Sequence, residues 1–235
     1  MKQLDYYSNK TPIMEYYESN IIEELPDFGN NIWTISNESV LHNFTILSDI
    51  GMKPILMMEQ FNIDLGSTNN NNSPYDAIYF YSNFTKIRPI YKYDKINVMN
   101  NVQIVANIIG QRIDPIDTMI LFYELNMTAE ILTINGINEY KYSYVCDEVK
   151  NNLLHTALLA KEHGYDVIIM DSYGIKGKGQ PIKNILQMVH EVSNICNIPI
   201  IICIPCSNNK QNGSKEITEY KTAKEYISRG FICKS

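Results

Sequence analysis

The residues best suited to chemistry in this sequence form a glycine-rich segment, Gly174-Ile175-Lys176-Gly177-Lys178-Gly179. Glycines let the backbone approach a ligand closely, and the two lysines add positive charge. Pro181 follows, and proline fits the first turn of a helix, where no amide donor is needed. A helix beginning there would add unpaired N–H groups and the positive end of its dipole. The combination predicts a site for a diphosphate or ribose-phosphate group. Its spacing matches neither a Walker A nor a Rossmann pattern, so a flexible turn whose glycines only permit the bend is the alternative.

The flanking elements are predicted to place this segment at one edge of a sheet. Residues 166–170 form a buried strand in this prediction, residues 181–196 a helix, and residues 198–204 a nearly continuous apolar strand. Uninterrupted apolar strands between amphipathic helices are typical of a mostly parallel sheet covered on both faces. Ligands of such sheets bind beyond the carboxyl ends of the strands, which is where the glycine-rich segment would lie.

The remaining segments are consistent with one α/β unit. The sequence predicts strands over 32–35, 54–58, 77–81 and 102–106, and helices over 6–25, 40–50, 116–135, 147–163 and 215–229. Ser39 with its two preceding residues is placed to cap the second of these helices, and Gly51 and Gly164 to end two of them. A polar loop is predicted over 62–73. Because no repeat or long linker divides the chain, we expect one domain over 1–235, with a core at about 30–205 and helical extensions at both ends.

Composition and charge exclude several functional classes. The formal net charge is -6 and the pI is about 5.3, so we expect no strong nucleic-acid binding. No apolar run reaches the roughly 20 residues that cross a bilayer, and the first residues lack the apolar core of a secretory signal. The sequence thus predicts a cytoplasmic or nuclear protein that is not secreted and has no membrane partner. Five cysteines without a second CxxC or a histidine pair indicate no metal and no cofactor, and we interpret Cys203 and Cys206 as a reduced structural pair.

Residues 167–181 resemble a segment of the macrodomain fold, in the variant of the microbial-type poly(ADP-ribose) glycohydrolases, which carry "LGAWGCGAFGNP" here. Tyr173 falls on the tryptophan of that motif, and Gly174, Gly179 and Pro181 on identical residues. Upstream, residues 33–39 and 53–60 resemble "TNEDSL" and "KPLVLNFAN". The resemblance implies a macrodomain-like three-layer α/β/α fold with a mostly parallel mixed sheet. It also implies an ADP-ribose site, whose residues would be Gly66, Tyr173, Gly174, Ile175, Lys176, Gly177, Lys178 and Gly179.

The residues that would cleave a ribosyl bond differ from that family. Its members follow "NFAN" with a "PGGG" loop, a glutamine and paired glutamates, whereas residues 62–72 keep only Gly66 and no Gln-Glu-Glu follows. Glycosidic cleavage needs a carboxyl group near the leaving oxygen, and Glu59 and Asp64 are the nearest carboxylates. In the glycine-rich segment, Lys176 replaces a family glycine and Lys178 its aromatic residue.

These observations predict a macrodomain-like module that binds ADP-ribose or a related nucleotide, free or on an ADP-ribosylated protein. Two alternatives stay open. One is an active ADP-ribose glycohydrolase with Glu59 or Asp64 as a relocated acid. The other is a protein-interaction descendant of the fold, in which Lys176 and Lys178 fill the old cleft.

Overall fold

In the computed structural model the described residues are 10–18, 33–59, 78, 81–86, 90–92, 95–107, 109–123, 131–134, 137–140, 142–171, 182–204 and 213–228. Within them the main sheet has seven strands: β1 (Ile13–Glu18), β2 (Trp33–Ser36), β3 (Pro54–Glu59), β4 (Lys95–Ala106), β5 (Arg112–Tyr123), β8 (Val167–Met170) and β9 (Ile200–Cys203). The helices are α1 (Val40–Asp49), α3 (Tyr142–Glu162), α4 (Ile182–Cys196), α5 (Gly213–Ser228) and the short 3-10 helix η3 (Asn83–Lys86). A separate hairpin pairs β6 (Ile131–Ile134) with β7 (Ile137–Tyr140).

The sheet is mixed, with a parallel core and an antiparallel side. Its order is β1-β4-β5-β3-β8-β9-β2. Strands β5, β3, β8, β9 and β2 are parallel to one another, and β4 runs antiparallel to both β1 and β5. The carboxyl ends of β2, β9, β8 and β3 therefore meet at one edge of the sheet, which we call the carboxyl edge.

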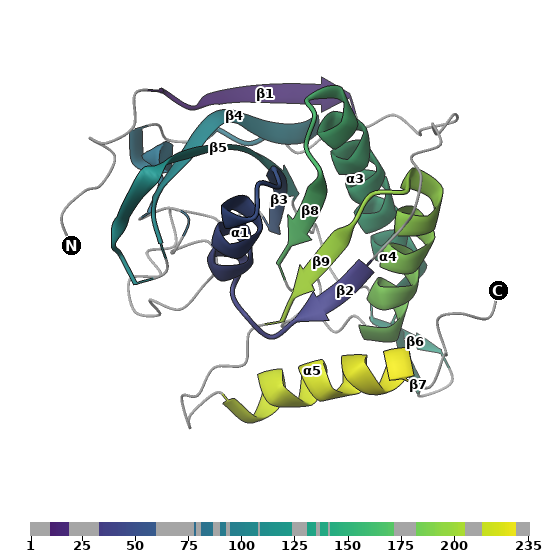
Figure 1. The fold of residues 1–235 in the computed structure, drawn as a ribbon. Coiled ribbons are helices and arrows are strands. Elements are labelled where there is room, and N and C mark those ends of the chain that lie inside the picture. The colour runs from purple at the N-terminus through teal and green to yellow at the C-terminus, as the bar shows by residue number, and fades with distance from the viewer. Residues whose placement is uncertain are drawn as a thin grey trace.

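Helices cover both faces of the sheet, giving three layers (Figure 1). Helix α1 lies on one face, and α3 and α4 lie on the other with α5 beside α4. Side chains alternate between the two cores: Ile168 and Met170 of β8 pack with α3 and α4, whereas Ile169 packs with α1. Every residue of β8 is buried, which explains why its sequence is apolar without interruption. The predicted α/β/α fold class with a mostly parallel mixed sheet is confirmed.

The predicted N-cap residue of α1 and the predicted glycines after two helices are also confirmed. Ser39 is the N-cap of α1, and its hydroxyl accepts a hydrogen bond from the backbone N–H of His42 at 3.1 Å. Gly51 and Gly164, which follow α1 and α3, have positive φ angles of 86° and 70°. A residue with a Cβ is strained in that conformation, so glycine suits the end of both helices.

Two helix predictions are wrong. The helix predicted over 6–25 is replaced, in its described part, by strand β1, so the N-terminal extension adds an edge strand that pairs with β4. The helix predicted over 116–135 is replaced by β5 and then β6. The end of β5, from Thr118 to Phe122, is buried on both faces, and periodicity cannot separate such a strand from a buried helix. The strand predicted over 77–81 is not seen where the chain is described, because Ile78 is helical and Tyr81 lies in a turn.

The other strand predictions and the helices over 147–163, 181–196 and 215–229 are confirmed with shifted ends. The helical extension at the C-terminus is α5, whose Ala223 is fully buried in the core with α4. The predicted loop over 62–73 lies outside the described residues. Among the helices of the described segments, none has the length and apolarity to span a membrane.

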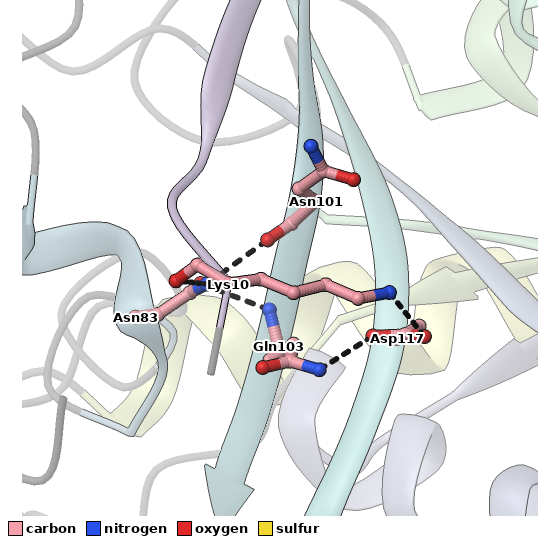
Figure 2. A network of polar contacts seen from close by, with 5 residues as sticks. All are labelled: Lys10, Asn83, Asn101, Gln103 and Asp117. Atoms are coloured by element: carbon pink, nitrogen blue, oxygen red, sulfur yellow. Dashed lines mark hydrogen bonds and ion pairs between the residues drawn. The ribbon is translucent and has the colours of Figure 1, made fainter. Parts of the chain in front are cut away.

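A polar network with a buried centre holds the N-terminal segment against β4 and β5 (Figure 2). Its members are Lys10, Asn83, Asn101, Gln103 and Asp117, and we call it the Asn83 network. The amide of Asn83 donates to the carbonyl oxygens of Lys10 (3.1 Å) and Asn101 (2.9 Å) and accepts from the N–H of Gln103 (2.9 Å). Asn101 has a φ of 57° at a register shift in β4, so Asn83 replaces the ladder bonds that this bulge interrupts.

The outer part of the network is an ion pair. The ammonium group of Lys10 lies 2.7 Å from one carboxylate oxygen of Asp117, and the side-chain amide of Gln103 donates to the other at 2.8 Å. Burial opposes ionisation of Asp117, but the hydrogen bonds from Lys10 and Gln103 outweigh it and hold its pKa below the ordinary value. The network thus holds Lys10, which precedes β1, against β4 and β5 of the sheet.

Candidate functional site

The carboxyl edge is held in register up to the last residue of each strand. Met57 of β3 pairs with Met170 of β8, and Met170 pairs with Ile202 of β9. Beyond the strands, the N–H of Asp171 donates to the carbonyl oxygen of Met57 at 3.2 Å, and the N–H of Ile204 donates to that of Ser36 at 2.8 Å. Backbone hydrogen bonds therefore fix the positions of the strand ends from which the connecting segments start.

The start of α1 is bonded to this edge. The side-chain amide of Asn43 donates to the carbonyl oxygen of Ser39 at 2.9 Å and to the sulfur of Cys203 at 3.3 Å. The N–H of Glu38 donates to the hydroxyl of Ser36 at 3.1 Å. These bonds hold the first turn of α1, with the positive end of its dipole, beside the end of β9.

Cys203 is a neutral thiol at this edge. It is free and fully buried, and burial raises its pKa far above the ordinary value. The nearby Asp171 carboxylate raises it further, and the hydrogen bond from Asn43 opposes the shift. Because nucleophilic attack and metal binding both need the thiolate, Cys203 serves the packing of the edge, in line with a structural interpretation. Its predicted partner Cys206 lies outside the described residues.

No group of three His, Cys, Asp or Glu residues capable of holding a metal ion occurs within the described residues. Cys196, at the end of α4, is likewise free and buried, and burial raises its pKa to about 11.

Most of the predicted site residues lie outside the described residues: Asp64, Gly66, Tyr173, Gly174, Ile175, Lys176, Gly177, Lys178 and Gly179. Their anchoring points are described. The glycine-rich segment connects the carboxyl end of β8 to the start of α4, as expected. Glu59 is the last residue of β3 and pairs through its backbone with Tyr123 of β5, so this candidate acid belongs to the carboxyl edge.

Two residues of the edge have no role in the predictions from sequence, Asp171 and Asn43. Asp171 is the first residue beyond β8, and ligands of α/β sheets bind just beyond the carboxyl ends of strands. A polar residue directly after a predicted buried strand is the sequence pattern that could have identified it. Asn43 lies 160 residues from Cys203 along the chain, and no local pattern connects them.

The same fold occurs in bacterial poly(ADP-ribose) glycohydrolases. The crystal structure of the enzyme from Thermomonospora curvata aligns with a TM-score of 0.58 at 10% identity, over 88% of this chain and 85% of that chain. The enzyme from Deinococcus radiodurans in complex with ADP-ribose aligns with a TM-score of 0.53 at 11% identity, over 83% of this chain and 85% of that chain. A structure of the T. curvata enzyme bound to the inhibitor ADP-HPD gives a TM-score of 0.53 at 9% identity, over 81% and 78% of the two chains.

These likenesses define the class of fold, which is the macrodomain-like fold of the poly(ADP-ribose) glycohydrolases. The resemblance predicted from the sequence is confirmed at that level. No family model matches the sequence, and no curated protein matches it significantly.

Proposed function

We propose that this protein binds ADP-ribose or a related nucleotide at the carboxyl edge of its sheet. The supporting observation is the place of the glycine-rich segment, which connects the carboxyl end of β8 to the start of α4 in a fold shared with enzymes crystallised with ADP-ribose. In α/β sheets, glycine-rich turns at this place bind phosphates through backbone N–H groups and the helix dipole. Gly174 to Gly179 would hold the diphosphate, with Gly66 on the opposing loop.

The proposal extends to the setting of the protein. The whole chain, residues 1–235, acts as one macrodomain-like domain, and its macromolecular partner is a protein that carries ADP-ribose. We place it in the cytoplasm or the nucleus, where ADP-ribosylated proteins can reach it.

Hydrolysis of the ribosyl bond is the second candidate function, and the position of Glu59 favours it. Glu59 is the last residue of β3, so its backbone lies at the carboxyl edge, the edge of the sheet where we propose the site. In such a reaction a carboxyl group protonates the leaving oxygen while water adds to the anomeric carbon. Without the Gln-Glu-Glu sequence of the related enzymes, binding is the function that we propose first.

Calorimetric titration with ADP-ribose tests the proposal. Gly177→Glu places bulk and negative charge in the glycine-rich segment, and we expect it to abolish saturable binding. Ile109→Glu is the matched control because it adds the same side chain at a residue that is 70% exposed in the turn between β4 and β5. This control should bind like the wild type.

A wild-type protein that gives no heat up to millimolar ADP-ribose would contradict the proposal and favour a protein-interaction role. Where binding is found, release of ADP-ribose from a modified protein separates hydrolysis from binding. Loss of that release in Glu59→Gln, with binding retained, would assign Glu59 as the acid.

A further inference from the structure

Asp171 has a defined position in the sheet although it lies beyond the end of β8. The pairs Met57 with Met170 and Met170 with Ile202 set the register, and the N–H of Asp171 continues the pairing to the carbonyl oxygen of Met57 at 3.2 Å. One step further in register, Asp171 lies between Met58 of β3 and Cys203 of β9.

The alternation of the strand gives the face. Ile169 packs in the core under α1, together with Met58 and Cys203. Asp171 follows Ile169 by two residues, so its side chain belongs to the same face as α1. The influence of its carboxylate on the pKa of Cys203 agrees with this placement.

Among the described residues, the two strand neighbours of Asp171 in this row are apolar or bonded elsewhere. Met58 and Cys203 are fully buried, and the Cys203 sulfur accepts a hydrogen bond from Asn43 of α1. Asp171 itself is only half-buried, so it is the residue of this row that reaches the surface of the edge. A carboxylate offers about four acceptor positions, which leaves capacity for hydroxyl donors beside its contacts within the protein.

The chemistry of the neighbouring segment restricts which part of a ligand can meet Asp171. The glycine-rich segment begins three residues later and contains Lys176 and Lys178, so it suits the anionic part of a ligand. A carboxylate repels phosphate and attracts donors, and a ribose offers two adjacent hydroxyl groups that a carboxylate can accept together. The glycohydrolase motif has glycine at this position, so the carboxylate is a feature of this chain.

We propose that Asp171 accepts hydrogen bonds from ribose hydroxyl groups of the bound nucleotide and so selects a sugar-bearing diphosphate over a bare one. This inference rests on the proposed function, and it adds a specificity residue to that site. The carboxylate of Asp171 strengthens binding of the ribose and weakens binding of any phosphate that approaches the same place. Its removal should therefore change the affinities for ADP-ribose and for pyrophosphate in opposite directions.

The test compares two probes, ADP-ribose and inorganic pyrophosphate, on the wild type, Asp171→Asn and Asp114→Asn. ADP-ribose is titrated by calorimetry, and pyrophosphate is measured by its displacement of ADP-ribose. We expect Asp171→Asn to weaken ADP-ribose about tenfold, because hydrogen bonds to a charged acceptor are the stronger ones. Pyrophosphate should bind equally well or better. Asp114→Asn replaces an exposed carboxylate of β5 and should change neither affinity.

Each outcome decides a different claim. Wild-type protein that binds ADP-ribose, with Asp171→Asn indistinguishable from it, overturns the role of Asp171 and leaves the proposed function standing. An equal loss for both probes also overturns it, because the site would then have been damaged as a whole. No binding of ADP-ribose by the wild type ends both proposals. Asp171→Gly, which restores the residue of the glycohydrolase motif, replaces Asp171→Asn if that variant unfolds at a lower temperature than the wild type.

Discussion

Two polar regions of the same sheet are built in opposite ways. In the Asn83 network, the side chain of Asn83 is fully buried, and it makes three hydrogen bonds to backbone groups of Lys10, Asn101 and Gln103. At the carboxyl edge, Asp171 is half-buried and precedes a glycine-rich segment. The first region joins parts of the backbone to one another. The second lies where the strands end, before the segment that we propose to bind a ligand.

The difference separates structural polar groups from candidate functional ones. A buried amide that uses both its donors and its oxygen stabilises one backbone arrangement, and removing it leaves several groups unpaired. A half-buried carboxylate just beyond the end of a parallel strand lies where ligands of α/β sheets bind. Substitutions in the network should therefore change stability alone, whereas those at the carboxyl edge should change binding, with or without a change in stability.

The largest effect is expected from Asn83→Ala. The change leaves the buried N–H of Gln103 without its side-chain partner, which costs about 1–3 kcal/mol. It also removes the amide's hydrogen bonds to the carbonyl oxygens of Lys10 and Asn101, each worth about 1 kcal/mol. We expect a loss of about 2–4 kcal/mol in the free energy of unfolding, measured by urea denaturation. The affinity of the folded protein for ADP-ribose should be unchanged.

Asn194→Ala is the control for this change, because Asn194 is exposed on α4 and its side-chain amide lies 2.9 Å from the imidazole Nε2 of His190, a contact at the surface. Its free energy of unfolding should stay within about 0.5 kcal/mol of the wild type. If both variants lost the same stability, Asn83 would not be the centre of a structural network.

An intermediate effect is expected at the carboxyl edge from Ser39→Ala. The variant removes the hydroxyl that caps α1, and loss of such a cap costs about 1 kcal/mol. Ser39→Gly should recover most of that loss, because glycine is an acceptable N-cap residue. Urea denaturation of both variants measures the difference.

The same variants refine the comparison of the two regions. Because Asn43 bonds both Ser39 and Cys203, a loosened first turn of α1 should also weaken ADP-ribose binding. Equal stability of Ser39→Ala and the wild type would show that the cap does not hold this turn. Ser228→Ala, at the exposed end of α5, is the control that should leave stability and binding unchanged.

The parallel part of the fold could be predicted from sequence because its signals are local. Residues 167–170 are apolar without interruption and residues 198–204 are nearly so, Gly164 ends a helix, and Ser39 caps one. Each pattern therefore lies within a few residues of the structure it specifies. The place of the glycine-rich segment follows from the same signals, since it stands between a clear strand and a clear helix.

The antiparallel side could not be predicted because its partners are distant. Strand β1 exists through pairing with β4, from Ile13 with Asn100 to Glu18 with Lys95, and nothing in residues 13–18 alone specifies that partner. The apolar run at the end of β5 is equally compatible with a helix. At the site, the row of Met58, Asp171 and Cys203 is brought together only by the register of three strands.

The smallest effect is expected from the ion pair at the outside of the Asn83 network. The pKa of Asp117 is lowered in the folded protein, so its carboxylate stabilises the fold above the unfolded pKa of about 3.9 and loses this contribution as the pH falls through the folded value. The Asp117 side chain is 57% exposed, so solvent screening should limit the contribution to about 0.5 kcal/mol. We expect Asp117→Asn to be less stable than the wild type at pH 7 by about that amount, and the gap to narrow at pH 3, as measured by urea denaturation.

Asp114→Asn should show no such pH-dependent gap, because Asp114 is exposed on the same strand. A gap for Asp117→Asn that persists at low pH would mean that Gln103, which also donates to this carboxylate, holds it irrespective of charge. A gap as large as that of Asn83→Ala would contradict the division of the network into a buried amide centre and an outer ion pair. The expected ratio of these two effects follows from burial, because the Asn83 amide is shielded from water and the Asp117 carboxylate is not.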